Sequence, residues 1–264
     1  MSRPPRILNP WHWDVPLAAL TGLIAVLMLN ANLSLFLGLN RLHLWTGDLF
    51  WAYVTMLGDT LIAFIVCLPL VRRWPQVVWA GLLAGLLATL FVHGLKPLFA
   101  LERPASALAL DQFHIIGRTY LVLGFPSGHS ATAFTLVGVM VLHLDESWRR
   151  WLGIPLIGLA ALVGLSRIVV GAHWPLDVLG GVVGGWLAAV FGTFWARRWP
   201  WGATPMGRRS LTVLLIGCGL SGLLYYKTGY PQTDLGRQIL ALFCLGWTGY
   251  QLCVEHSIGR AGSR

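Results

Sequence analysis

Long apolar stretches separated by short polar segments run along the whole chain. A membrane hydrocarbon core of about 30 Å needs about 20 apolar residues per helix. Measured against this length, the pattern predicts eight membrane-spanning helices. The chain is therefore expected to be an all-α, polytopic transmembrane bundle. It is expected to form a single membrane domain over residues 1–264. The predicted spans are residues 16–39, 50–70, 76–95, 125–144, 151–168, 176–196, 210–226 and 237–254.

The first predicted span can also be read as a cleaved signal peptide, because Leu17 to Leu29 looks like a short apolar signal core. The apolar run resumes over Leu33–Leu39, however, and no clear small-x-small cleavage site is present. We therefore expect a retained signal-anchor helix.

Basic residues mark one side of the predicted membrane. Each predicted inner segment carries at least two arginines, and positively charged residues favour the inner side. Both termini are therefore predicted to lie inside. The arginines of the predicted inner segments are Arg3, Arg6, Arg72, Arg73, Arg149, Arg150, Arg197, Arg198, Arg208, Arg209, Arg260 and Arg264.

Composition excludes the main alternatives to a membrane protein. Apolar residues make up 56% of the chain and charged residues 11%, against about 25% charged in soluble domains. A disordered chain would be poor in apolar residues. The net charge of +9 is explained by anionic lipid headgroups and the inner-side bias, so no nucleic-acid partner is expected. The four cysteines lie in apolar stretches and lack the spacing of a metal site. We therefore expect them to be reduced thiols that pack among apolar side chains.

Three polar clusters interrupt this apolar pattern. They are Lys96–Pro104, Pro126–Ser130 and Ser166–Asp177. Ionisable residues within a membrane protein are costly and mark functional sites. The predicted topology puts all three clusters at the outer side, so we expect them to converge on one site at one membrane face.

The charged residues of these clusters indicate an oxyanion ligand. Lys96, Arg103 and Arg167 supply three cations without a matching carboxylate cluster, which suits a phosphate group. Ser127 is expected to cap a helix whose first N–H groups point at the anion. Gly128 would let the backbone approach the anion closely.

Two histidines are candidates for catalysis. Pro175 fits the first turn of a helix, which places His173 just outside the helix and Asp177 within that turn. The carboxylate would orient the imidazole so that its other nitrogen can attack phosphorus, and His129 would protonate the leaving oxygen. Two histidines and an aspartate also make a possible metal set. Three nearby cations oppose a divalent ion, so we expect neither a metal nor another cofactor.

The clusters resemble the three motifs of the type 2 phosphatidic acid phosphatase (PAP2) superfamily. Lys96–Pro104 matches KxxxxxxRP, Pro126–His129 matches PSGH, and Ser166–Asp177 matches SRxxxxxHxxxD, with no departure at a defining position. The resemblance implies a metal-independent phosphatase with a phosphohistidine intermediate. It implies His173 as nucleophile, Asp177 as its partner and His129 as acid/base. The phosphate ligands it implies are Lys96, Arg103, Ser127, Gly128 and Arg167.

The chain is predicted to have more transmembrane helices than the six-helix core that members of this family commonly have. Residues 16–196 are expected to form that core, and residues 210–256 to add two C-terminal transmembrane helices. These helices could shape a lipid entry groove, contact a partner or extend the bundle.

The leading functional hypothesis is a lipid phosphatase at the outer face of the membrane. Its expected substrate classes are polyprenyl diphosphate, phosphatidic acid or phosphatidylglycerol phosphate, and lipid A. A bacterial cytoplasmic membrane with the site facing the periplasm or outside would suit recycling of the undecaprenyl carrier. The alternatives are a lipid-to-lipid phosphotransferase using the same site and, from a different class, a non-catalytic lipid-binding or transport protein.

Other ionisable residues have simpler explanations. Glu102 is expected to pair with Arg103, and His93 to be a satisfied helix-end residue. Asp59 is read as a hydrogen-bonded packing residue at least as readily as a catalytic one. His114 and Arg118 are expected in a solvated loop.

Overall fold

The computed structural model describes residues 10–261, and the side chains of residues 11–254. Only helices occur within that range, which confirms the all-α prediction. The longer elements are α1 (Pro10–Met28), α2 (Asn32–Asn40), α4 (Asp48–Met56), α5 (Thr60–Cys67), α6 (Pro75–Phe99), α8 (Gly128–His143), α9 (Glu146–Val169), α10 (Pro175–Arg198), α11 (Pro205–Leu224) and α12 (Asp234–Ala261). The short ones are α3 (His43–Thr46), η1 (Leu68–Leu70), α7 (Pro104–Ala107), η2 (Pro200–Ala203) and η3 (Pro231–Thr233).

Helix α10 is the centre of the bundle and packs against α1, α6 and α8. Its glycines allow α8 to approach within backbone contact. A Cβ atom on Gly181 would lie 2.5 Å from the carbonyl oxygen of Ser127, and one on Gly185 would lie 2.3 Å from that of Ala131. This close packing, typical of small residues in membrane helices, holds the start of α8 against the start of α10.

Two predicted spans are interrupted in the structure. The expected helix over 16–39 is wrong, because α1 ends at Met28 and α2 begins at Asn32, with Asn30 in the left-handed conformation at φ 50°. The expected helix over 50–70 is divided into α4 and α5, which are bent by 64° at Leu57–Asp59. There Asp59 caps α5 by accepting hydrogen bonds from the backbone N–H groups of Leu61 and Ile62.

Among the described residues, α1, α6, α9 and α10 are long and apolar enough to cross a membrane, and α4 with α5 would make a fifth span if counted as one. The eight spans and the inner position of both termini stay predictions. Of the arginines counted for that orientation, Arg3, Arg6 and Arg264 and the side chain of Arg260 lie outside the described residues.

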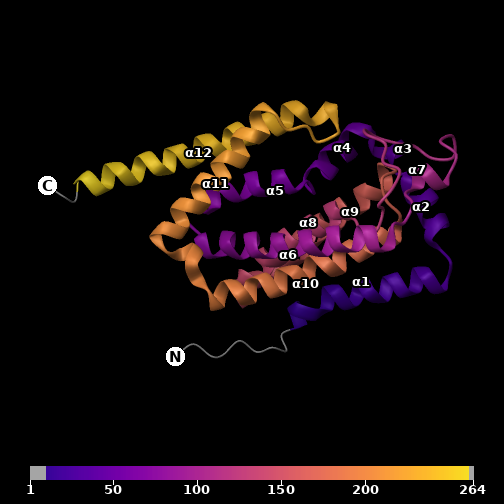
Figure 1. Ribbon diagram of the computed structural model, residues 1–264, viewed down its shortest axis with the longest axis horizontal. Helices are drawn as coiled ribbons and strands as arrows, with labels where there is room; N and C mark the ends of the chain where they lie inside the picture. Colours follow the sequence, from indigo (N-terminus) through magenta and orange to yellow (C-terminus); the bar gives the residue numbers. More distant parts are fainter. Residues whose placement is uncertain (1–9, 262–264) are drawn as a thin grey trace.

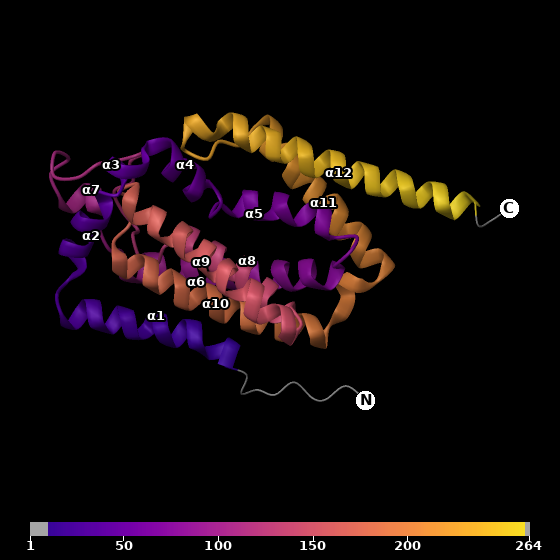
Figure 2. The same ribbon diagram turned by 180° about the vertical axis from the view of Figure 1, so that it is seen from behind.

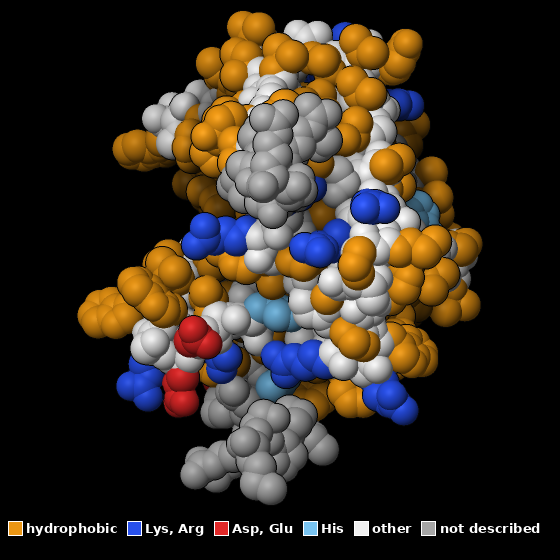
Figure 3. All heavy atoms as spheres, turned by 90° about the vertical axis from the view of Figure 1, so that its left-hand side faces the viewer, with side chains coloured by type: hydrophobic (Ala, Val, Ile, Leu, Met, Phe, Trp, Pro, Cys, Tyr) orange, Lys and Arg blue, Asp and Glu red, His pale blue; other side chains and the backbone are white. Residues whose placement is uncertain are grey.

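The two ends of the bundle differ in character. The loops that carry the three polar clusters gather at the end where α9 stops and α10 starts, whereas α10 and α12 end at the opposite end (Figure 1). At that opposite end, Arg149 and Arg197 donate hydrogen bonds to the carbonyl oxygens of Val141 and Leu142, near the C-terminus of α8. Lys and Arg side chains are spread over this face (Figure 3).

Helices α11 and α12 form a hairpin on the side of the bundle opposite α1 (Figures 1 and 2). They pack against α5 and η1, and the turn between them places η3 against α4. The hairpin therefore reaches from the arginine-rich end to the end that holds the polar clusters.

Candidate active site

Arg103 joins the first and third polar clusters. It lies just before α7, and its side chain is 6% exposed. Its Nη1 atom donates to the carbonyl oxygen of Ala172 at 3.0 Å and contacts Nε2 of His173 at 3.2 Å, while its Nε donates to the carbonyl oxygen of Val122 at 2.9 Å. The guanidinium is thus oriented by backbone carbonyls on one side and faces the histidine on the other.

His173 and Asp177 meet across the turn that leads into α10. Gly171 adopts φ 74° and turns the chain after α9, and Asp177 lies in the first turn of α10. Oδ2 of Asp177 accepts hydrogen bonds from the backbone N–H of Trp174 at 3.0 Å and from Nδ1 of His173 at 3.1 Å. Both side chains are buried, so this carboxylate holds the imidazole in one orientation.

The hydrogen bonds of His173 decide which ring nitrogen carries the proton. Arginine has donors only, so Nε2 must accept from Arg103, and Nδ1 must carry the proton that is donated to Asp177. Burial and the positive charges of Arg103, Arg167 and Lys96 lower the pKa of His173 well below its ordinary value of 6.5. At neutral pH the ring is therefore neutral, with the Nε2 lone pair directed at the cations.

The second cluster starts α8 beside this pair. Ser127 is the N-cap of α8, and its Oγ accepts from the backbone N–H of Ser130 at 3.4 Å. Its backbone N–H donates to the carbonyl oxygen of Asp177 at 2.9 Å, which ties the second cluster to the third. A Cβ on Gly128 would have its nearest neighbour at 3.8 Å, on Val92. That distance is an ordinary contact, and Gly128 also lines an open groove. The helix N-terminus is therefore accessible, which favours an anion.

Arg167 is the most enclosed of the three cations, at 2% exposed. Its Nη1 donates hydrogen bonds to Oγ1 of Thr55 and to Oη of Tyr230. Its Nε is buried and has no hydrogen-bond partner among the described residues. A buried charged donor without an acceptor is costly, and a bound phosphate oxygen would satisfy it.

Lys96 and His129 complete the set. Lys96 lies in the last turn of α6, and its Nζ donates to the carbonyl oxygen of Leu123 at 3.0 Å. His129 lies in the first turn of α8, with its Cβ against Gly58 at the α4–α5 break. All eight residues expected at the site therefore lie around the meeting point of α6, α8, α9 and α10.

The remaining candidates have structural partners. Glu102 does not pair with Arg103 in the described part of the chain; its carbonyl oxygen accepts from Trp174 Nε1. Asp59 caps α5 and accepts a hydrogen bond from the hydroxyl of Tyr226. His114 pairs with Asp48 at 2.9 Å.

Several contacts of the site involve residues that no sequence motif indicated. Tyr120 lies under the guanidinium of Arg103, with 4.9 Å from Cζ to the ring centroid. Thr55 and Tyr230 hold Arg167 from segments far away in the chain. Nothing in the local spacing of these residues distinguishes them from other threonines and tyrosines.

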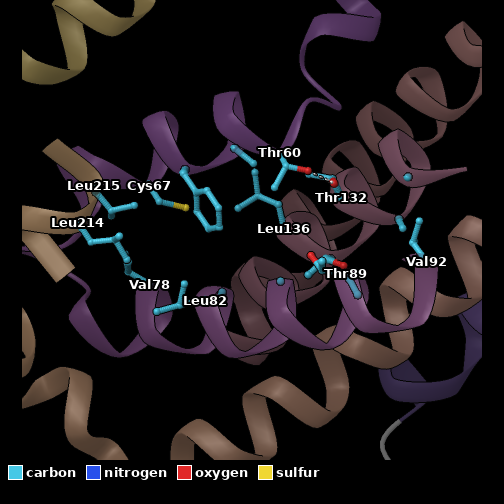
Figure 4. Close-up of a pocket in the computed structure, with 18 of the residues that line it drawn as sticks. Thr60, Cys67, Val78, Leu82, Thr89, Val92, Thr132, Leu136, Leu214 and Leu215 are labelled. Atoms are coloured by element: carbon cyan, nitrogen blue, oxygen red, sulfur yellow. Dashed lines mark hydrogen bonds between the residues drawn. The ribbon is translucent and has the colours of Figure 1, made fainter. Parts of the chain in front are cut away.

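An open apolar groove starts beside Gly128 and His93 and runs between α5, α6 and α8 towards α11. Figure 4 shows Val92 and Thr132 on one side of this space and Leu214 and Leu215 of α11 at the other. Small residues such as Gly81 and Gly85 form the wall on α6. The groove thus connects the start of α8 with the C-terminal hairpin.

Comparison with known proteins finds similarity to one family over part of the chain. A family model described as the PAP2 superfamily matches residues 76–201. An undecaprenyl-diphosphatase of Sulfolobus acidocaldarius is 37% identical over 86 residues, which cover 30% of this chain and 40% of that protein. A lipid A 1-phosphatase of Rhizobium etli is 32% identical over 130 residues, which cover 46% of this chain and 48% of that protein. The chain therefore spans less than half the length of these curated relatives.

A solved structure supports the likeness at the level of the fold. The crystal structure of Aquifex aeolicus LpxE matches with a TM-score of 0.53 and 29% sequence identity, and the match covers 61% of this chain and 93% of the other. The family match ends at residue 201, before α11 begins at Pro205. The C-terminal hairpin is therefore additional to the matched domain.

Proposed function

Residues 76–201 of this chain belong to the PAP2 superfamily, and from that premise we propose that the protein is an integral membrane lipid phosphatase. It hydrolyses phosphomonoester or diphosphate headgroups without a metal ion. The observation that carries this proposal is the orientation of His173, whose Nδ1 is held by Asp177 while Nε2 faces Arg103. A neutral, oriented imidazole beside buried cations is what nucleophilic attack on a phosphate requires.

The proposed reaction has two transfers. In the first, Nε2 of His173 attacks phosphorus and the bond from phosphorus to the leaving oxygen breaks, while His129 donates a proton to that oxygen. The leaving oxygen is the lipid oxygen of a phosphomonoester or the bridging oxygen of a diphosphate, whose leaving group is the lipid monophosphate. Asp177 stabilises the positive charge that develops on the imidazole. In the second, His129 removes a proton from water, the water oxygen attacks phosphorus, and the phosphohistidine bond breaks to release phosphate and restore neutral His173.

The cations bind and neutralise the phosphate during both transfers. Arg103 exchanges its contact with Nε2 for a phosphate oxygen, which frees the lone pair for attack. The unpartnered Nε of Arg167 and the ammonium of Lys96 take the other oxygens. Ser127 and Gly128 offer the N-terminus of α8, where negative charge is stabilised by the helix dipole.

The groove supports a substrate with a long hydrocarbon tail. It is apolar, it begins at the phosphate-binding start of α8, and it runs along the bundle between helices that would lie in the membrane. The named relatives act on undecaprenyl diphosphate and lipid A, and both classes are candidates for this chain. The site lies opposite the arginine-rich end, which favours an orientation with the site facing outwards. The bacterial cytoplasmic membrane, with the site towards the periplasm or outside, is the proposed location.

The function is tested by phosphate release from the purified protein in detergent with EDTA present. The panel holds undecaprenyl diphosphate, phosphatidic acid, phosphatidylglycerol phosphate and lipid A. We expect release from at least one lipid at a rate that EDTA leaves unchanged. Labelled phosphate that appears on an acceptor lipid instead of in solution would identify a phosphotransferase. No turnover of any lipid by folded protein would contradict both reactions and point to binding or transport.

The groove predicts how tail length affects turnover. Leu214→Trp adds bulk at the α11 end of the groove and is expected to lower kcat/KM for undecaprenyl diphosphate by about 10-fold, the scale of overpacking. Dioctanoyl phosphatidic acid, whose tails end before α11, should be unaffected. Leu220→Trp is the control, because Leu220 is exposed on α11 and does not line the groove. Equal losses for long and short lipids would contradict tail binding in the groove.

A further inference from the structure

The turn between α11 and α12 contacts Arg167 through Nη1, a different nitrogen from the unpartnered Nε. Oη of Tyr230 lies 2.7 Å from Nη1 of Arg167, and the Tyr230 side chain is 1% exposed. Thr55 supplies the second acceptor for the same Nη1 atom. Tyr230 lies beyond residue 201, so a residue outside the matched domain holds a cation of the phosphate site.

The turn that carries Tyr230 is held by its own hydrogen bonds. Oγ1 of Thr228 accepts from the backbone N–H of Tyr230 at 3.2 Å, and Oγ1 of Thr233 donates to the carbonyl oxygen of Tyr230 at 2.8 Å. Both threonines are buried. The neighbouring loop is joined to the turn where the N–H of Arg118 donates to the carbonyl oxygen of Gly229 at 3.1 Å.

The ring of Tyr230 is also enclosed. Gly117 adopts φ 78°, and a Cβ atom there would lie 2.5 Å from Cδ1 of Tyr230. Only glycine therefore permits this contact without displacing the ring. With the backbone bonded and the ring enclosed, the hydroxyl has little freedom to follow a moving guanidinium.

A second tyrosine ties the same segment to the other side of the site. The hydroxyl of Tyr226 donates to Oδ2 of Asp59 at 2.5 Å, and Asp59 caps α5. This cap directly follows Gly58, which packs against the Cβ of His129. The C-terminal turn therefore contacts Arg167 directly through Tyr230, and through Tyr226 it contacts the segment that packs against His129.

We propose that Tyr230 is a positioning residue for the phosphate-binding Arg167, which makes the α11–α12 hairpin part of the active site. The hydroxyl and Thr55 engage Nη1 and so orient the guanidinium with Nε towards the phosphate. Arginine has many rotamers, and without this bond the guanidinium would spend less time in the binding orientation. The inference rests on the proposed phosphatase function, since it assigns Arg167 to phosphate.

The test removes only the hydroxyl. Tyr230→Phe is expected to lower kcat/KM by about 10-fold, the scale for a hydrogen bond to a charged group, and to weaken inhibition by vanadate by a similar factor. Tyr225→Phe is the matched control, because Tyr225 precedes the same turn and is 79% exposed. The control should match the wild type in rate and in vanadate inhibition.

A double-mutant cycle separates positioning from general stability. In an Arg167→Ala background, the added Tyr230→Phe substitution should change kcat/KM less than twofold, because the residue it positions is gone. A full 10-fold loss in both backgrounds would overturn the proposal, as would wild-type kinetics and vanadate inhibition in Tyr230→Phe itself.

Two further results separate a positioning role of Tyr230 from a loss of folding and from a failure of the proposed phosphatase function. If Tyr230→Phe lowers thermal stability too far to assay, Thr55→Val removes the other acceptor of Nη1 and should show the same dependence on Arg167. Wild-type kinetics in Thr55→Val would then count against the proposal. Failure of the phosphatase function has a different signature, since the wild type itself would then neither release phosphate nor respond to vanadate.

Discussion

Replacing His173 with alanine is expected to abolish phosphate release, with a loss of at least about 10⁴-fold in kcat, comparable to removal of a catalytic nucleophile in other enzymes. The physical reason is that Nε2 of His173 carries the lone pair that attacks phosphorus. The imidazole is oriented by the contact of Nε2 with Arg103 and by the hydrogen bond from Nδ1 to Asp177. The measurement is the initial rate of labelled phosphate release from the preferred lipid. Rapid acid-free quenching should also capture labelled protein in the wild type and none in the variant.

The control for this prediction is another histidine of the same bundle. His143 lies at the far end of α8, where its Nδ1 contacts the carbonyl oxygen of Val139 at 2.8 Å. His143→Gln should keep the wild-type rate within about twofold, as expected for a substitution away from the site. If the His173→Ala protein unfolds at the wild-type temperature, which shows that it is folded, and still turns over lipid at the wild-type rate, the proposed nucleophile is wrong.

Replacing His129 with alanine should divide the reaction into its two steps. For a lipid phosphomonoester such as phosphatidic acid the leaving alkoxide needs a proton, so the rate should fall by about 10²–10⁴-fold, the range for general acid–base catalysis. An aryl phosphate such as 4-nitrophenyl phosphate has a leaving group, nitrophenolate, that departs without protonation. Its first transfer should therefore still occur, whereas hydrolysis of the phosphohistidine is slow because no base activates water. Rapid mixing should show a burst of nitrophenolate approaching one per protein.

The double variant decides whether that burst arises from the proposed intermediate. In His129→Ala combined with His173→Ala the burst should disappear, because no nucleophile is present. A burst that persists without His173 would indicate a different nucleophile. Equal rate losses for the lipid and the aryl phosphate in His129→Ala, without a burst, would show that His129 acts in binding or folding.

Local sequence was a good guide where a structural feature depends on a few neighbouring residues. Ser127 caps α8, Pro175 starts α10, and Asp177 falls in the first turn of α10. These outcomes depend on backbone geometry and hydrogen bonds within one turn, which residue type and spacing determine. The glycines of α10 act through an equally simple cause, because a missing Cβ allows close helix contact in any packing arrangement.

Hydropathy was a poorer guide to continuity within apolar segments. The breaks after Met28 and at Leu57–Asp59 occur inside apolar runs, and an average over about 20 residues does not register a single residue that ends a helix. Asp59 is the N-cap of α5 because its carboxylate accepts hydrogen bonds from the N–H groups of Leu61 and Ile62. Only the tertiary structure shows that Tyr226, far away in the chain, donates to the same carboxylate.

The sequence by itself determined the helical membrane architecture, the three motifs and the chemistry of a cationic site with an oriented histidine, because periodicity, composition and short spacings carry that information. Only the tertiary structure decided that Arg103 contacts His173, that a groove runs from Gly128 to α11, and that Tyr230 holds Arg167. Each of these is a contact between helices distant in the chain. Such contacts depend on how the helices cross, which no local pattern encodes.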